Sequence, residues 1–255
     1  MTNSPNRATA DFSGSVAMIV GCDETGIWIA RDLASRGAAV GLCGNDPGVL
    51  EGIAGKIAAE GGKVIAVETD GAGEVSITNA VDRVLTRFGT IDILINNPGV
   101  PRAGSLADVS PSELRTSIDA NVTTPFFAMQ AVIPSMRARR YGRIINIFSL
   151  SYLGLPGQVS VSATHAALFG LTRSISLEAA VDGISVNAVA KGDTDGSNVA
   201  GDAEKPASQI PVRRMGTAAD VAYAVRFFVS PSAKYVTGQT LFVCGGKSAY
   251  FSMSA

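Results

Sequence analysis

The chain has 255 residues, a length that fits one α/β domain and allows an ample buried core. Its formal net charge is −1 at pH 7 and its lysines and arginines are scattered, so charge gives no case for nucleic-acid binding. Charged residues make up 17% of the sequence, against roughly 25% in typical domains, and we expect so apolar a chain to cover part of its surface in subunit contacts.

Neither a metal site nor a membrane segment is expected. The three cysteines, Cys22, Cys43 and Cys244, share no ligand spacing, and the chain has a single histidine. Residues 1–11 are polar and lack the apolar core of a signal peptide, and no apolar run approaches the ~20 residues of a membrane-spanning helix. We therefore expect a cytoplasmic protein.

Strand and helix patterns alternate along the chain. The apolar run at residues 16–20, which ends at Gly21, predicts the first buried strand. The alternation predicts an α/β fold with a Rossmann-like, doubly wound parallel sheet of about seven strands, covered on both faces. We expect a flexible N-terminus at residues 1–12 and a single domain at residues 13–255. The predicted strands are residues 16–20, 39–43, 63–69, 91–95, 143–148, 185–189 and 240–243, and the predicted helices are residues 26–36, 49–60, 75–88, 111–137, 159–180 and 218–229.

Six segments carry specific motifs: IDILINNPG at 91–99, DANVT at 119–123, GRIINI at 142–147, AALFGLTR at 166–173, GISVNAV at 183–189 and TGQ at 237–239. They make the chain resemble the short-chain dehydrogenase/reductase family from residue 16 to residue 246. Together they are specific for the fold and say less about activity. The resemblance implies a nicotinamide cofactor and a Tyr-x-x-x-Lys pair on one helix. In that pair the tyrosine gives or takes the proton, and the lysine lowers the tyrosine pKa and holds the cofactor ribose.

The positions that match the family's catalytic set are altered. Val161 stands at the tyrosine position and His165 at the lysine position, while Asn121 and Ser149 match the family's helix asparagine and substrate-orienting serine. Valine has no titratable group, and a histidine with a pKa near ~6.5 is mostly neutral at pH 7. We therefore assign no catalytic residue. Tyr152 remains open as a substitute proton donor beside Ser149 or as an aromatic residue packed on the sheet edge.

The turn after the first strand is also degenerate. The family's Gly-x-x-x-Gly-x-Gly turn is one residue short at residues 21–26; Gly21 and Gly26 can act as its first and last glycines, which leaves Glu24 near the middle position. A carboxylate ~4 Å from a phosphate charge costs roughly 1 kcal/mol in water and ~4 kcal/mol near a protein surface. We therefore expect the acidic turn to connect the strand to the helix without binding the cofactor.

Other cofactor positions are kept only in part. Neither the NAD preference nor the NADP preference of the family is present, because Gly44 and Asn45 stand where relatives carry Asp or Arg. Asp70 and Asn97 match the adenine-side aspartate and a strand-end asparagine, but Lys191 replaces the proline beside the nicotinamide. We predict that this chain binds no nicotinamide cofactor and that NAD(P) is bound by a partner subunit.

Three functions are compatible with these losses. The first is a non-catalytic subunit that forms a hetero-oligomer, expected as a tetramer, with a catalytically complete paralogue. The losses resemble those in the non-catalytic subunit of a heteromeric hydroxyacyl-CoA dehydrogenase, such as that of benzylsuccinate breakdown. Family members assemble through two long helices, a C-terminal helix and the last strand, which are the best-kept parts of the resemblance. Those segments are residues 112–137, 159–180, 218–229 and 240–243.

The other two functions use this chain's own cleft. One is an active oxidoreductase whose proton donor is Tyr152, or a water held by Ser149 and His165. The other is a non-redox enzyme or ligand-binding protein that uses the vacated cleft.

Overall fold

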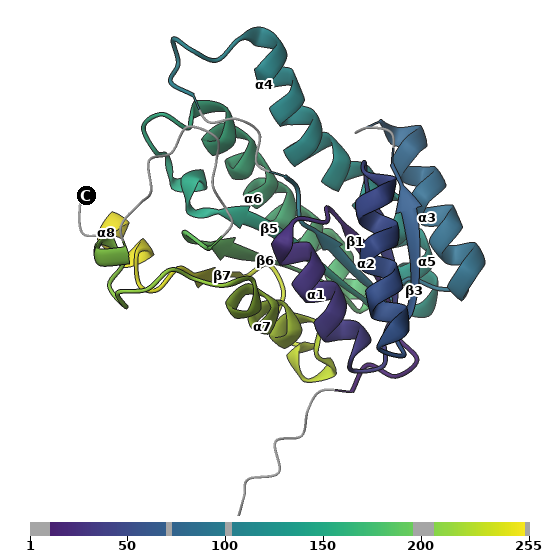
Figure 1. Cartoon of the computed structure of the whole chain (residues 1–255). Helices are drawn as coiled ribbons and strands as arrows, with labels where there is room; N and C mark the ends of the chain where they lie inside the picture. The colour runs from purple at the N-terminus through teal and green to yellow at the C-terminus, as the bar shows by residue number, and fades with distance from the viewer. Residues whose placement is uncertain (1–10, 70–72, 100–103, 196–206, 253–255) are drawn as a thin grey trace, which may run out of the picture.

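The computed structural model describes residues 11–69, 73–99, 104–195 and 207–252. Its described part contains a parallel sheet of seven strands in the order β3-β2-β1-β4-β5-β6-β7 (Figure 1). The strands are β1 (Val16–Val20), β2 (Ala39–Gly44), β3 (Lys63–Glu68), β4 (Ile93–Asn96), β5 (Gly142–Ser149), β6 (Ile184–Lys191) and β7 (Thr240–Val243). The predicted fold class, with its single domain, is confirmed.

Helices cover both faces of the sheet. Alternate side chains of β1 point to opposite faces: Ala17 and Ile19 pack with α1, α2 and α7, whereas Met18 packs with α3, α5 and α6 (Figure 1). Both faces of the central strands are therefore apolar, which explains their unbroken hydrophobic runs. The helices are α1 (Glu24–Ala34), α2 (Pro47–Ala59), α3 (Glu74–Phe88), α4 (Pro111–Ile118), α5 (Thr124–Arg139), α6 (Val159–Ala179), α7 (Ala218–Val229) and α8 (Ser248–Ser252).

The long helix predicted at residues 111–137 is not continuous. It is interrupted by a π-helical turn at Asp119–Thr123, which separates α4 from α5. Asn121 lies in this turn, fully buried, and its Nδ2 donates to Thr164 Oγ1 of α6 at 2.9 Å. Such single π turns inside helices are frequent at functional sites.

Two ends of the chain differ from the prediction. Residues 1–10 of the predicted flexible N-terminus lie outside the described residues, but Phe12 is 2% exposed and packs in the core, so the folded domain includes it. The short helix α8 was not predicted. Among the described residues, no helix is long and apolar enough to cross a membrane.

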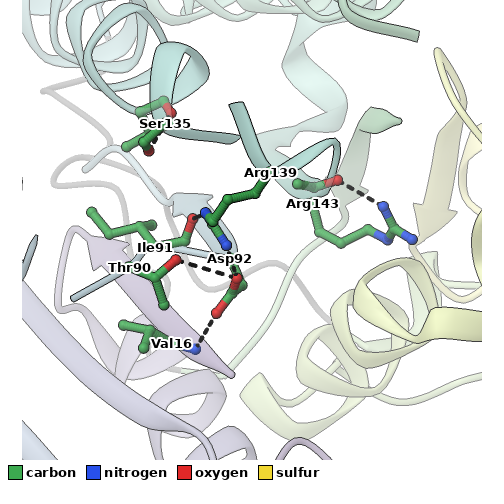
Figure 2. Close-up of polar contacts among 9 residues, drawn as sticks. Val16, Thr90, Ile91, Asp92, Ser135, Arg139 and Arg143 are labelled. Atoms are coloured by element: carbon green, nitrogen blue, oxygen red, sulfur yellow. Dashed lines mark hydrogen bonds and ion pairs between the residues drawn. The ribbon is translucent and has the colours of Figure 1, made fainter. Parts of the chain in front are cut away.

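A polar network fastens the amino ends of the central strands (Figure 2). Asp92 accepts a hydrogen bond from the Val16 backbone N–H at 2.9 Å and forms a close ion pair with Arg139 of α5. Arg139 also donates to the Ile91 carbonyl at 2.6 Å. This network joins β1, β4 and α5 at the end of the sheet opposite the carboxyl ends of the strands.

Candidate functional site

The crevice at the carboxyl ends of β1 and β4 is the place where this fold binds ligands, because the strand order reverses there. The turn after β1 is tightly packed. A Cβ on Gly21, whose φ is +98°, would collide with the Asn97 carbonyl oxygen, and a Cβ on Gly26 would collide with the Gly21 carbonyl oxygen. The two glycines thus bring α1 against the end of β1.

Helix α1 begins at Glu24, two residues earlier than predicted. Asp23 is its N-cap, and Asp23 Oδ1 accepts a hydrogen bond from the Gly26 backbone N–H at 3.0 Å. Glu24 itself is an exposed residue of the first turn. The acidic side chain that occupies the start of the helix is therefore Asp23 and not Glu24. Aspartate is one of the preferred N-cap residues, so Asp23 was a sequence signal from which the start of α1 could have been predicted.

Asp23 is also bound by two side chains from other strand ends. Asn97, which follows β4, donates from Nδ2 to Asp23 Oδ1 at 2.6 Å. Lys191, the last residue of β6, places Nζ 3.5 Å from Asp23 Oδ2. Because β4 and β5 lie between β1 and β6, the Lys191 side chain reaches across their carboxyl ends. Its side chain is 7% exposed and that of Asp23 is 43% exposed, so Lys191 fills this part of the crevice and pairs with a partly exposed carboxylate.

A cavity of about 570 Å³ remains on the β2 side of the crevice. Gly44, Asn45 and Asn97, three positions that match cofactor positions of the family, line it, whereas Asp70 lies outside the described residues. Three carboxylates and no lysine or arginine are among its described lining residues. The acidic residues are Asp23, Asp46 and Asp119.

The structure brings His165 and Ser149 together. Ser149 donates its backbone N–H to His165 Nδ1 at 3.2 Å, and its Oγ lies 3.0 Å from the same nitrogen. Since Nδ1 accepts the backbone bond, the proton of the neutral ring lies on Nε2, which is buried without a partner among the described residues. Ser151, which the sequence did not single out, places its Oγ 3.4 Å from Nδ1.

The imidazole of His165 is held neutral. The side chain is 1% exposed, and burial, with a smaller effect of the Lys191 charge, lowers its pKa to about 4. His165 is therefore a packed residue whose lowered pKa leaves the imidazole neutral at pH 7. Val161, one turn earlier on α6, is fully buried and apolar.

Tyr152 faces an aromatic cluster. Its ring centroid lies 5.1 Å from that of Phe148 and 5.2 Å from that of Phe169, with Phe242 of β7 at 6.3 Å. In the described chain its hydroxyl makes no hydrogen bond with Ser149 or His165, and burial raises its pKa. Of the two interpretations left open, the geometry favours packing at the sheet edge, because the higher pKa makes Tyr152 a weaker acid.

Comparisons with known proteins agree with this geometry. Residues 25–248 match the family described as Enoyl-(Acyl carrier protein) reductase. The chain is 45% identical over 247 residues to "(2S)-[(R)-hydroxy(phenyl)methyl]succinyl-CoA dehydrogenase subunit BbsC" of Thauera aromatica, covering 96% of this chain and 99% of that protein. It is 35% identical over 242 residues to the 3-oxoacyl-[acyl-carrier-protein] reductase FabG of Escherichia coli (strain K12), covering 92% and 98%.

A solved structure shows the same fold. A putative short-chain alcohol dehydrogenase from Sinorhizobium meliloti 1021 superposes with a TM-score of 0.89 at 30% identity, covering 94% of this chain and 98% of that one. The expected resemblance to a subunit of a hydroxyacyl-CoA dehydrogenase is confirmed by the relative from Thauera aromatica. The match along nearly the whole chain, the seven-stranded sheet and the remains of the catalytic set together show that this chain belongs to the short-chain dehydrogenase/reductase family.

Proposed function

We propose that this chain is a non-catalytic subunit that assembles with a catalytically complete paralogue in a hetero-oligomeric, NAD(P)-dependent hydroxyacyl-CoA dehydrogenase. One observation carries the proposal: the positions of the family's Tyr and Lys hold a fully buried valine and a buried, neutral histidine. Neither Val161 nor His165 can deliver a proton to a carbonyl oxygen at neutral pH. The relative from Thauera aromatica supports the assignment, because its name describes a dehydrogenase subunit.

The cofactor is assigned to the partner. The acidic residues of the turn, the Lys191–Asp23 ion pair and the lack of a basic residue among the described lining of the cavity disfavour a dinucleotide with its two phosphates. The wild-type chain alone should therefore show no saturable NAD(H) or NADP(H) signal in calorimetry. A micromolar dissociation constant would contradict this part of the proposal.

Exposed apolar side chains mark the assembly surface. β7 is an edge strand, and Leu241 and Phe242 on it are each 40% exposed. Helix α7 exposes Tyr223 and Phe227, and the end of α6 exposes Leu177. Aromatic and aliphatic groups of this kind form the centres of stable subunit interfaces.

Co-expression with a paralogue that retains Tyr-x-x-x-Lys tests the proposal. We expect native mass spectrometry to show both chains in equal numbers, and dehydrogenase activity that is lost when the paralogue's tyrosine is replaced. His165→Gln in this chain is the matched control and should leave turnover unchanged. A stable homo-oligomer that ignores the paralogue, whose activity is the same without this chain, would contradict the proposal.

The cavity of about 570 Å³ favours a second candidate, a ligand-binding or non-redox use of the cleft. Its volume lies in the range of small-molecule sites. Native mass spectrometry of the gently purified chain distinguishes the two: a retained small molecule would favour ligand binding. The active-oxidoreductase alternative has less support. Its first proton donor, Tyr152, is packed among Phe148, Phe169 and Phe242. Its second, a water held by Ser149 and His165, would depend on a buried, neutral imidazole, although the two side chains do lie 3.0 Å apart.

A further inference from the structure

The start of α1 has hydrogen-bond donors of the kind that bind an anion, but these donors bind the side chain of Asp23. A helix N-terminus, with its free N–H groups and positive dipole end, is where dinucleotide folds bind the cofactor pyrophosphate. Here the Asp23 carboxylate accepts from the Gly26 N–H, from Asn97 Nδ2 and from Lys191 Nζ. A backbone amide, a side-chain amide and an ammonium group are the donors that a bound phosphate would take.

We propose that the Asp23 carboxylate, whose side chain is 43% exposed, takes the place of the cofactor pyrophosphate, and that the buried Lys191, paired with it, closes the crevice over the ends of β4 and β5. The chain thereby keeps its crevice ordered without a cofactor. This inference rests on the proposed function in one respect, because it assumes that the subunit works without bound NAD(P).

Burial of Lys191 is the second observation that carries the inference. Its side chain is 7% exposed, and an ammonium group so buried requires a counter-charge. Among the described residues, Asp23 holds the carboxylate within 4.0 Å of Lys191 Nζ. The neighbouring His165 cannot substitute for it, since an imidazole is never an anion. Removing the Asp23 carboxylate should therefore leave an unpaired, buried cation.

The short turn explains how Asp23 reaches this position. With one residue fewer than the family's glycine turn, the chain passes from Gly21 to the first residue of α1 within three residues. The residue at the helix N-cap is then Asp23, and the packing of Gly26 against the Gly21 carbonyl fixes the helix start. A glycine at position 23 would also cap the helix, but it would remove the acceptor of the Gly26 N–H and of Lys191 Nζ, while Asn97 Nδ2 would keep its 3.2 Å bond to the Gly21 carbonyl.

The test is thermal unfolding of the full chain with and without inorganic pyrophosphate. Asp23→Gly should lower Tm and create a response to the anion: at about ten times Kd, pyrophosphate should raise its Tm by about 3 °C. The wild type should show no shift. Asp46→Gly is the matched control, since Asp46 caps α2 through a 3.0 Å bond to the Val49 N–H but has no lysine partner in the described chain. It should not respond either.

Further variants keep the test decisive if Asp23→Gly does not fold. Asp23→Asn keeps the cap and its shape but removes the charge, so it should lower Tm without creating a pyrophosphate response. A double-mutant cycle of Asp23→Asn with Lys191→Met should show non-additive losses, because each change removes the same ion pair. In Asp23→Gly, adding Lys191→Met should abolish the response to pyrophosphate.

Two results would overturn the inference: a wild-type response to pyrophosphate equal to that of Asp23→Gly, or additive losses in the cycle. Neither measurement involves a partner subunit. If these measurements contradict the role of Asp23, the test of the hetero-oligomer is unaffected. If they agree with it but no complex with the paralogue forms, only the proposed function is contradicted.

Discussion

At the scale of single residues, the charge of His165 follows from its surroundings. Its Nδ1 accepts a backbone hydrogen bond, its side chain is buried, and the charge of Lys191 lies nearby. All three disfavour the imidazolium form. The histidine therefore serves packing at pH 7 and becomes a source of instability in acid.

The first prediction is a loss of stability below the unfolded pKa of His165. That pKa is 6.5, and the folded value is about 4. Between these values the unfolded chain binds a proton that the folded chain does not, so the stabilisation is fully present above pH 6.5 and lost as the pH falls toward 4. Urea unfolding should show that lowering the pH from about 7 to about 5 costs about 2 kcal/mol.

His165→Gln is the comparison for this measurement. The variant cannot gain the proton, so its stability should change much less over the same interval of pH. An equal loss in both proteins would show that another group controls the acid sensitivity.

The second prediction is that Val161→Tyr combined with His165→Lys does not create a ketone reductase. The variant regains a proton donor, but the crevice still holds the Lys191–Asp23 pair and lacks an aligned hydride donor. Val161 is fully buried, so the larger ring should also destabilise the fold by about 1–3 kcal/mol. Cofactor-dependent turnover clearly above that of each single variant would contradict this expectation.

At the scale of elements, the network at the amino ends of the strands contrasts with the altered crevice at the other end. The Asp92 carboxylate satisfies the Val16 N–H and the Arg139 guanidinium at once (Figure 2). Because Asp92 and Val16 are both buried, solvent cannot replace the bond to the Val16 N–H, whereas the Arg139 side chain is 35% exposed. The scaffold is thus tied together at one end of the sheet, whereas near the other end Val161 and His165 stand at the positions that match the family's Tyr and Lys.

The third prediction is that Asp92→Ala lowers the free energy of unfolding by about 2 kcal/mol, because it leaves the buried Val16 N–H without a partner and removes the ion pair of the partly exposed Arg139. The control is Glu60→Ala, which breaks an exposed ion pair with Arg31 whose side chains are about half exposed. That variant should change the stability by less than about 1 kcal/mol. Equal effects in denaturant unfolding would argue against a structural role for the network.

Sequence periodicity was sufficient to predict the bounds of a helix or strand where the local pattern and the tertiary packing agree. The bounds of α7 and β7 were predicted residue for residue, because an apolar periodic segment is bounded by capping or turn residues in each case. The π turn around Asn121 was not, since it depends on a hydrogen bond to Thr164 in a helix far along the chain. The Asp23–Lys191 pair was missed for the same reason: its members are 168 residues apart.

At the scale of the whole molecule, the two edges of the sheet differ in the apolar side chains that they expose. α7 lies beside the edge strand β7, and the two elements together expose Tyr223, Phe227, Leu241 and Phe242. The opposite edge of the sheet, at β3, is flanked by α2 and α3, where Val75 is 73% exposed at the start of α3. The aromatic residues on α7 fit the centre of an interface better than the exposed valines of α2 and α3, Val49 and Val75, do.

The last prediction therefore compares charge introduced at these two places. Phe227→Asp on α7, where the side chain is 52% exposed, should weaken assembly with the catalytic paralogue by at least about 2 kcal/mol, or roughly thirtyfold in Kd, because a carboxylate would be buried in an apolar interface. Val75→Asp on α3 introduces the same charge on an exposed helix position at the other edge and should leave assembly unchanged. Analytical ultracentrifugation of the co-expressed pair measures both. If Val75→Asp dissociates the complex and Phe227→Asp does not, the interface lies at the β3 edge, and the assignment of α7 and β7 to assembly is wrong.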